Sequence, residues 1–337
     1  MSGMRARLCV LVIGLAFQGC GLIVDVVQLV RPIAADEMDA ICARRRLQVG
    51  MAVEPFRPFV FPAIWTDVGS RVTGLDVELV HEITAALSRH CGEPPLTPVL
   101  RLIRFRDLFV ELNEGKLDVF VSAVAANVPS PTLAGFAYSI PYFYNAGISG
   151  ITKRPEVAER VRERLRTHGA GPDGLGGKEH ALDGLTVAVQ EETGAHLYAA
   201  ANLKDIRLVL CDSLPAAFES EDPPVDVILG GQPILEFMVK RVRKDWQLLV
   251  LDNGKPFFLT RENYVVVMAE GSYRLRWFVN NLLFRLDESG RLARMRERWL
   301  EETYAYPRRA AIEGLPFAVE KMVGQYYQGQ CRWARQS

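Results

Sequence analysis

The sequence predicts an α/β protein of two lobes, each built on a doubly wound, mostly parallel sheet, with a two-strand hinge between them. Two observations predict this fold class. Apolar strand patterns alternate with helical patterns, an order that favours parallel sheets, and the whole alternation occurs twice along the chain. The chain has 337 residues, of which 49% are hydrophobic, and this is enough for two cored domains.

The first α/β unit begins with the apolar run 47–53, which ends in a Pro-rich turn and predicts a buried strand. Apolar residues at helical spacing over 75–87 predict the helix that follows. The other predicted elements of this unit are a strand at 98–103, a helix at 107–113 and a strand at 119–124.

The second unit is predicted to begin with a strand at 147–152 that crosses to the second lobe. A charged helix at 155–167 follows, and then a Gly-rich stretch. That stretch has no dinucleotide-binding or P-loop pattern, so we interpret it as a flexible surface insertion. The remaining predicted elements are strands at 185–189, 206–210 and 225–229, helices at 194–202 and 214–219, a return strand at 263–268 and helices at 273–286 and 290–301.

These elements define the predicted domain organisation. We expect a signal peptide or membrane anchor at 1–35, lobe 1 at 36–149 and 264–302, lobe 2 at 150–263 with an insertion at 153–183, and a C-terminal extension at 303–337. The hinge is predicted to run through 147–152 and 259–264. The sequence assigns no role to the extension.

The N-terminus is predicted to direct export to the periplasm. Arg5 and Arg7 precede an apolar run over 8–30. Three interpretations stay open: cleavage before Asp36, after the small residues that end at 35; lipidation at Cys20; and retention as a membrane anchor.

Composition narrows the function classes. The 40 basic and 40 acidic residues form no long run of one sign, so a nucleic-acid partner is not expected. The sequence has no CxxC or HxxxH pattern and only five scattered histidines, so neither a metal nor another cofactor is expected.

Four cysteines remain if the first 35 residues are removed, and an even number permits disulfides in an oxidising compartment. Cys42–Cys91 is the first candidate pair, because the two positions flank a strand and a helix that meet at one end of the sheet. Cys42–Cys331 is the second candidate, and four reduced thiols are the third interpretation.

Four short blocks carry a resemblance to a known family. They are LQVGMAVEPFRPF at 47–59, GLDVELV at 74–80, FRDLFVELNEGKLDV at 105–119 and SIPYF at 139–143, and LDESGRL at 286–292 adds to them. In this order and spacing they resemble the extracytoplasmic solute-binding proteins of the polar amino acid uptake family, family 3, which have the type II periplasmic-binding fold. The resemblance spans roughly residues 45–300.

The resemblance implies a ligand site between the lobes, where the carboxyl ends of the strands face each other. It implies that Phe56 covers the ligand, that Phe105 lines the pocket, and that the Thr193-Gly194 loop meets a ligand carboxylate. Simpler roles stay open, such as a core position for Phe56 and helix capping by Thr193. The complete predicted site is Phe56, Phe105, Ser122, Ala123, Asn127, Glu192, Thr193, Gly194, Gly231 and Gln232.

The chain departs from the resembled family where members clamp an α-amino acid. Members hold an arginine shortly after the third strand, and here 125–133 has no basic residue. Members also hold an acidic residue at the position where 230–232 reads Gly-Gly-Gln. A zwitterionic ligand is therefore not expected unless Glu192, Arg57 or Arg104 takes over, and Asn127 and Gln232 suit a neutral or weakly polar solute.

Three functions follow, in order of preference. The first is a periplasmic solute-binding protein that delivers a small polar molecule to an inner-membrane ABC permease. The second is an accessory or sensor subunit of the same fold that binds a periplasmic protein. The third is an enzyme such as a dehydratase, for which Glu192 is the candidate carboxylate; no Ser/His/Asp or Cys/His set supports hydrolysis, and we expect no enzyme.

Overall fold

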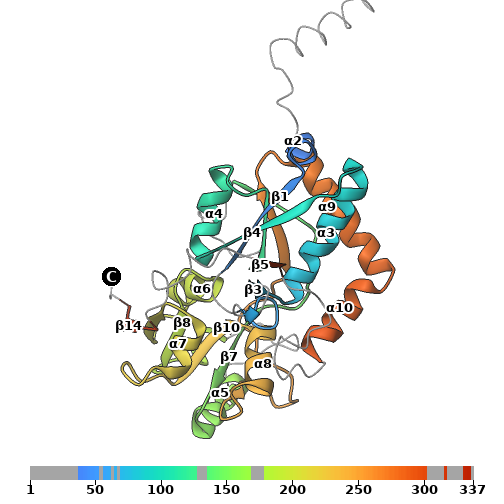
Figure 1. The fold of residues 1–337 in the computed structure, drawn as a ribbon. Helices are drawn as coiled ribbons and strands as arrows, with labels where there is room; N and C mark the ends of the chain where they lie inside the picture. The colour runs from blue at the N-terminus through green and yellow to red at the C-terminus, as the bar shows by residue number, and fades with distance from the viewer. Residues whose placement is uncertain are drawn as a thin grey trace, which may run out of the picture.

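Two sheets with helices on their faces form the two lobes of the protein (Figure 1). The computed structural model describes residues 37–52, 56–61, 64–66, 69–126, 135–167, 178–301, 315–316 and 329–334. The predicted export segment lies outside these residues. No helix in the described part of the chain has the length and apolar character needed to cross a membrane.

The lobe 1 sheet has the order β4-β1-β5-β12-β6. β1 (Arg46–Ala52) lies between β4 (Thr97–Ile103) and β5 (Val119–Ala125) and is parallel to both. β12 (Tyr264–Ala269) and β6 (Phe136–Tyr138) complete the sheet in antiparallel pairings. Because β12 comes from far along the sequence, the chain returns to lobe 1 after it has built lobe 2.

Helices cover both faces of this sheet (Figure 1). α3 (Leu75–Cys91), α9 (Tyr273–Glu288) and α10 (Arg291–Leu300) contact one another on one side, and α2 (Glu37–Arg44) joins them. α4 (Phe105–Asn113) packs against β1, β5 and β12. A small sheet of β2 (Ile64–Thr66), β3 (Gly69–Val72) and β13 (Leu315–Pro316) adds to this lobe.

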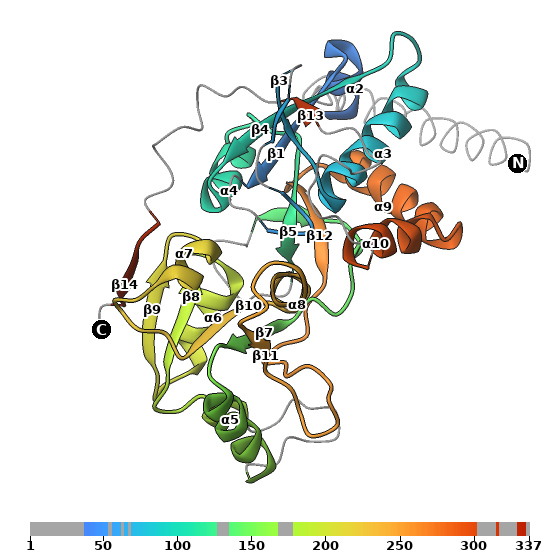
Figure 2. The same cartoon turned by 60° about the horizontal axis from the view of Figure 1, so that its bottom comes forward.

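The lobe 2 sheet has the order β11-β7-β10-β8-β9-β14 (Figure 2). Its strands are β7 (Ile148–Thr152), β8 (Thr186–Gln190), β9 (Arg207–Cys211), β10 (Val227–Gly231), β11 (Gln247–Leu248) and β14 (Cys331–Trp333). Its helices are α5 (Pro155–Thr167), α6 (Gly194–Asn202), α7 (Leu214–Glu219) and α8 (Gln232–Arg241), with a short 3-10 turn η2 (Lys178–His180). β8 is parallel to β9 and β10, whereas β7 and β14 are antiparallel to their neighbours.

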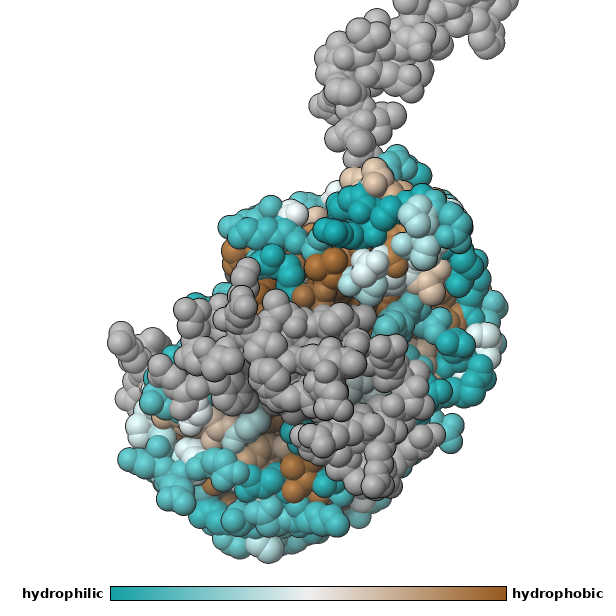
Figure 3. Space-filling view, in the orientation of Figure 1, coloured by the Kyte–Doolittle hydropathy of each residue, from teal (hydrophilic) through white to brown (hydrophobic). Residues whose placement is uncertain are grey.

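The buried strand β8 shows why the lobe 2 sheet forms. Its sequence, TVAVQ, is buried at every position. Val187 and Val189 belong to one apolar cluster and Ala188 to another, because alternate residues point to opposite faces of a strand. Helices therefore cover both faces, as expected for a parallel sheet with a continuous apolar run. In Figure 3, hydrophilic residues cover much of the rim of the visible face, and patches of apolar residues show between them.

The predicted elements match the observed ones to within a few residues, and helices 194–202 and 214–219 match their observed bounds. The elements that the sequence did not predict are α2, β2, β3, β6, η2, α8, β11, β13 and β14. Most of these are strands of two to four residues, which are too short to show a period. α8 was missed because it begins directly after two glycines, which favour a loop.

The first predicted hinge segment is wrong. Residues 148–152 form β7, which pairs with both β10 and β11 inside the lobe 2 sheet. The chain instead crosses between the lobes at 139–147 and 260–263, which we call the crossing segments. A backbone hydrogen bond pairs them, in which Ala146 N donates to Glu262 O at 2.8 Å. Next to this bond, Tyr264 N at the start of β12 donates to Phe143 O of the first segment at 2.8 Å.

Two disulfides are present among the described residues. Cys42 is bonded to Cys91, and Cys211 is bonded to Cys331. The alternative pair Cys42–Cys331 is therefore wrong, because β14 carries Cys331 to the edge of lobe 2, where it faces Cys211 on β9. Part of the predicted C-terminal extension thus supplies an edge strand to the lobe 2 sheet.

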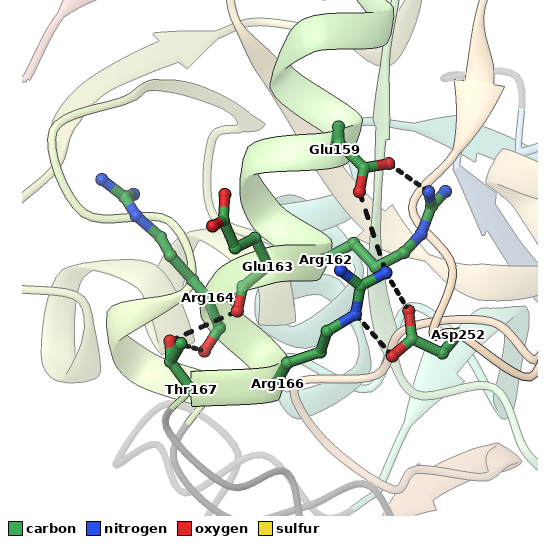
Figure 4. Close-up of polar contacts among 7 residues, drawn as sticks. All are labelled: Glu159, Arg162, Glu163, Arg164, Arg166, Thr167 and Asp252. Atoms are coloured by element: carbon green, nitrogen blue, oxygen red, sulfur yellow. Dashed lines mark hydrogen bonds and ion pairs between the residues drawn. The ribbon is translucent and has the colours of Figure 1, made fainter.

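The predicted insertion begins with the ordered helix α5. Its apolar face, Val157, Ala158, Val161 and Leu165, is buried. Figure 4 shows the polar side, where Arg166 reaches out of the helix toward Asp252. The guanidinium donates two hydrogen bonds of 2.7 Å each to that carboxylate. This helix therefore packs onto lobe 2. The Gly-rich stretch for which flexibility is expected, 169–177, lies outside the described residues.

Candidate ligand site between the lobes

A cavity of about 470 Å³ lies between the lobes. Both lobes line it, together with the crossing segment at 260–263, and its volume falls in the range of sites for small organic molecules. The position agrees with the rule that open parallel sheets bind ligands at the carboxyl ends of their strands, since β5, β8 and β10 all end at the cavity.

The lobe 1 wall is aromatic. Phe56 follows β1, and Phe105 and Phe109 lie on α4, which begins directly after β4. The rings of Phe56 and Phe105 meet edge to face at a centroid distance of 5.7 Å, and those of Phe105 and Phe109 at 6.0 Å. This wall offers an apolar surface with ring faces to a ligand.

The described lobe 2 wall has no Phe, Tyr or Trp and combines small residues with aliphatic side chains such as Leu229 and Ile234. The loop between β8 and α6 presents Thr193, Gly194 and Ala195 to the cavity. The Thr193 hydroxyl caps α6 by accepting a hydrogen bond from His196 N at 3.4 Å, and it donates to Gln190 O at 2.7 Å. The first N–H groups of a helix have no partner within it, so this end of α6 presents donors to the cavity.

An ion pair joins the two walls at the rim of the cavity. Arg106 Nη1 on α4 lies 3.1 Å from Glu192 Oε1 in the β8–α6 loop. The hydrogen bond to Glu192 raises the pKa of the Arg106 guanidinium. Arg106 Nε also lies 3.2 Å from Asp107. Glu192, the carboxylate considered for a dehydratase, is thus bonded to a guanidinium and partly exposed to solvent.

Buried polar groups line the inner part of the cavity. The Glu262 side chain accepts a hydrogen bond from Thr260 Oγ1 at 2.8 Å, and burial raises the pKa of its carboxyl. Burial also raises the pKa of Tyr264 well above its usual value. Gln190, at the end of β8, is 4% exposed, and its Oε1 has no hydrogen-bond partner among the described residues. Each of these three residues lines the cavity.

Lobe 1 and lobe 2 touch closely at Gly231. A Cβ atom at this position would lie 2.1 Å from the Tyr264 hydroxyl oxygen, well inside contact distance. Gly231 ends β10 in lobe 2, and Tyr264 begins β12 in lobe 1. A glycine is therefore required here for the two lobes to come this close.

The buried carboxyl group of Asp76 stabilises the end of β5, one of the strands that line the cavity. Asp76 accepts hydrogen bonds from Ala123 N and from the Tyr142 hydroxyl, each at 2.8 Å. The backbone of Ala123 is in the left-handed region, with φ +49°, which is uncommon for a residue other than glycine. Burial raises the pKa of Asp76 to about 7. Asp76 thus holds the strand end that faces the cavity.

The structure brings most of the predicted site residues to one place. Those that line the cavity are Phe56, Phe105, Ala123, Glu192, Thr193, Gly194 and Gly231. Arg57 and Arg104, considered as replacement clamps, are not among the lining residues. Asn127 lies outside the described residues.

Two predicted site residues do not line the cavity. Ser122 is fully buried, and its Oγ accepts a hydrogen bond from Ala52 N at 3.0 Å, so it ties β5 to β1. Gln232 begins α8, and its Nε2 donates to Glu236 Oε2 at 2.6 Å. Its side chain turns along the helix because the two residues lie one turn apart.

The sequence missed several lining residues, above all Arg106, Asp107, Phe109, Gln190, Glu262 and Tyr264. The rule that selected strand ends could have found Gln190, the last residue of β8. Glu262 and Tyr264 come from the second crossing segment and the strand after it, where no local motif marks a site. Among the described residues, no group of three or more His, Cys, Asp or Glu side chains could hold a metal ion.

The chain matches one family of known proteins. The model of the family "Bacterial extracellular solute-binding proteins, family 3" matches residues 47–302, which is most of the chain. No curated protein matches the chain.

Solved structures share the fold. A mutant of ArgBP from T. maritima is 24% identical, with a TM-score of 0.61, over 79% of this chain and 100% of that one. The amino acid ABC transporter substrate-binding protein AbpA from Streptococcus pneumoniae, bound to L-arginine, is 21% identical, with a TM-score of 0.62, over 78% and 98%. The ancestral amino acid-binding protein AncCDT-1, a precursor of cyclohexadienyl dehydratase, is 20% identical, with a TM-score of 0.61, over 79% and 100%. At these identities the likeness establishes the two-lobed fold.

Proposed function

We propose a function from the family to which this chain belongs, the bacterial extracellular solute-binding proteins of family 3. The protein captures a small organic molecule between its lobes in the periplasm and presents it to an inner-membrane ABC permease. The observation that carries the proposal is the cavity of about 470 Å³ that both lobes line. A ligand that contacts both walls stabilises the closed arrangement of the lobes, and this closure is the signal that a permease can recognise.

Three features support an exported binding protein. The N-terminus has the pattern of an export signal, and the two disulfides suit an oxidising compartment. Three titratable groups at the cavity are bonded to one another, since Arg106 pairs with both Glu192 and Asp107. The Glu192 carboxylate is therefore engaged by a guanidinium, which favours binding over a dehydratase reaction at that residue.

The test is a thermal-shift screen of the mature protein against amino acids, organic acids, amines, polyamines and sugars. We expect one chemical class to raise the melting temperature, because a ligand that binds only the folded state stabilises it by mass action, by about 2.7 kcal/mol at a hundredfold excess over Kd. A chain that responds to none of the classes would contradict the proposal.

A matched pair of variants locates the binding. Ala195→Tyr places a ring in the cavity from the first turn of α6, whereas Ala200→Tyr places the same ring on the exposed side of that helix. We expect the first variant to lose the ligand response and the second to keep it. Loss in both variants, or in neither, would place the ligand elsewhere.

A second candidate function, recognition of a periplasmic protein, is favoured by one observation. α9 carries three exposed aromatic residues, Tyr273, Trp277 and Phe284, with Trp277 71% exposed. Their spacing of four and seven residues puts them on one face of the helix. Exposed aromatic residues of this kind are enriched at the centres of protein interfaces.

The two candidates make opposite predictions. If a periplasmic protein is the true ligand, a defined partner should co-purify with the wild-type chain and with Ala195→Tyr, but not with Trp277→Ala. If the cavity binds the ligand, Trp277→Ala should keep the full thermal shift with the small molecule. The pair of variants therefore separates the functions in one set of purifications.

A further inference from the structure

The charged groups of the cavity are unevenly divided. The described lining carries three carboxyl groups, Asp107, Glu192 and Glu262, but a single guanidinium, Arg106. Arg106 is already bonded to two of these carboxylates, with contacts of 3.1 Å to Glu192 and 3.2 Å to Asp107. Burial also lowers the pKa of His196, which keeps this imidazole neutral. No cationic side chain of the described lining is therefore left for a ligand carboxylate, whereas Glu262 has no cationic partner there.

The buried polar side chains mainly offer acceptors. Gln190 Oε1 is buried and has no hydrogen-bond partner among the described residues. A buried acceptor without a donor is costly, so this amide oxygen calls for a donor from a bound molecule. Glu262 is 6% exposed and accepts one hydrogen bond, from Thr260, which leaves acceptor capacity on its carboxyl.

The aromatic wall suits the same kind of ligand. Phe56, Phe105 and Tyr264 line the cavity, and the faces of such rings attract cations as well as apolar groups. The N–H groups at the start of α6 would suit an anion, but no cationic side chain of the described lining is left to balance a full negative charge. Those N–H groups remain free to meet a neutral acceptor, such as a hydroxyl or an ether oxygen on the ligand.

We propose that the cavity takes an organic amine: an apolar or aromatic body that carries an ammonium group and no carboxylate. The ammonium donates hydrogen bonds to Gln190 Oε1 and to Glu262, and the body packs against the lobe 1 rings. The inference rests on the proposed function and names its ligand class. It also accounts for the absence of the family's arginine clamp from the sequence, because a ligand without an α-carboxylate does not need one.

The test is a set of four compounds that share one body: 2-phenylethylamine, phenylalanine, 3-phenylpropionate and 2-phenylethanol. Isothermal titration with the mature protein measures each affinity, and an aliphatic amine of similar length extends the set. We expect the amines to bind at least tenfold more tightly than the compounds that carry a carboxylate or only a hydroxyl. Tighter binding of phenylalanine, the acid or the alcohol would overturn the amine assignment and leave the solute-binding function standing. If neither these compounds nor the wider thermal-shift screen yields a ligand, the proposed function fails as well.

Two variants identify the groups that recognise the ammonium. Glu262→Gln keeps the shape of the side chain and removes its charge, and Gln190→Met removes the unpaired acceptor. Each should lower the amine affinity at least tenfold, and Glu262→Gln should also shrink the preference for the amine over the alcohol. A variant that merely disturbed the fold would weaken both compounds equally, so the ratio is the decisive readout. Glu219→Gln is the matched control and should change neither the amine affinity nor the ratio, because the Glu219 side chain is 73% exposed at a helix end and does not line the cavity. An unchanged ratio in Glu262→Gln would overturn its role.

Discussion

The two lobes face the cavity with different chemistry. Lobe 1 presents aromatic rings, such as Phe105 and Phe109, whereas lobe 2 presents aliphatic side chains, such as Leu229, and small residues, such as Gly194. One wall therefore offers ring faces, and the other offers aliphatic contact, room and backbone hydrogen-bonding groups. Any molecule in the cavity would contact two unlike surfaces at once, and not the same surface twice.

The lobes also differ in which elements their disulfides connect. In lobe 1, a disulfide joins α2 to the end of α3, and the buried Asp76 holds the end of β5. In lobe 2, the second disulfide fastens a terminal strand, β14, to the edge of the sheet. Arg332 on that strand is paired with Glu191, beside the loop that lines the cavity. One disulfide therefore lies within the body of its lobe, and the other attaches an addition to it.

The largest effect expected concerns these two disulfides. Replacing Cys42 and Cys91 by serine should lower the free energy of unfolding by about 4 kcal/mol, because the bridge spans a sequence separation of 49 residues and restricts the unfolded chain. Replacing Cys211 and Cys331 should cost less globally, because β14 has three residues at a sheet edge and can detach locally. Urea unfolding measures the first effect, and hydrogen exchange at β14 measures the second. Equal losses in the free energy of unfolding of the two variants would contradict this difference between the disulfides.

The second prediction concerns the pH dependence that Asp76 gives to lobe 1. Its pKa is about 7 in the folded protein against a usual 3.8, so between these values the folded state holds more protons than the unfolded state. Stability therefore falls as pH rises from about 4 to 7, by up to about 1.4 kcal/mol per pH unit from this group. In Asp76→Asn this contribution should vanish, so the free energy of unfolding of the variant should rise relative to that of the wild type as pH increases. Tyr142→Phe removes a hydrogen bond that lowers the pKa of Asp76. The loss of stability with rising pH should therefore continue to higher pH in this variant.

Urea unfolding at a series of pH values checks this prediction. An amide at position 76 can still accept from Ala123 N and donate to the Tyr142 oxygen, so the comparison isolates the charge. Parallel pH profiles for the wild type and Asp76→Asn would contradict it.

The third prediction tests the contact between the lobes. Gly231→Ala should push the Tyr264 hydroxyl away and open the cleft, at a cost of about 1–3 kcal/mol to the closed arrangement. Gly230→Ala is the matched control, because its Cβ would meet Leu235 at an ordinary 3.4 Å. Small-angle scattering compares the radius of gyration of the two variants. Adding Tyr264→Phe to Gly231→Ala should restore the wild-type value, and a failure of this rescue would mean that another contact sets the spacing.

The smallest effect is expected at the rim. Arg106→Gln and Glu192→Gln should show a coupling of about 0.2–1 kcal/mol in a double-mutant cycle, because both side chains are partly exposed and water screens their attraction. The coupling should shrink at high salt. Thermal unfolding of the two single variants and the double variant measures it. A coupling that salt does not change would indicate that the pair is shielded from solvent.

Local sequence patterns were sufficient for most of the fold. Apolar runs and helical spacing predicted the main strands and helices because each such element must bury one face or both. α6 and α7 could be delimited because Thr193 and Ser213 cap them, and such caps are visible in the sequence. Elements such as β6 and β14 escaped, since strands this short exist only through the neighbours with which they pair.

The candidate site also has residues that the sequence could place and residues that it could not. Residues at strand ends and in the β8–α6 loop, such as Phe56 and Thr193, could be placed near one another because topology brings strand ends together, and both line the cavity. The sequence alone could not show that Ser122 bonds inward to Ala52, that Gln232 belongs to a helix, or that Glu262 reaches the cavity from a crossing segment. Those outcomes depend on which partner a polar group finds, and that partner lies far away in the sequence. A side chain's residue type sets what it can bond to, but packing sets which partner lies within reach.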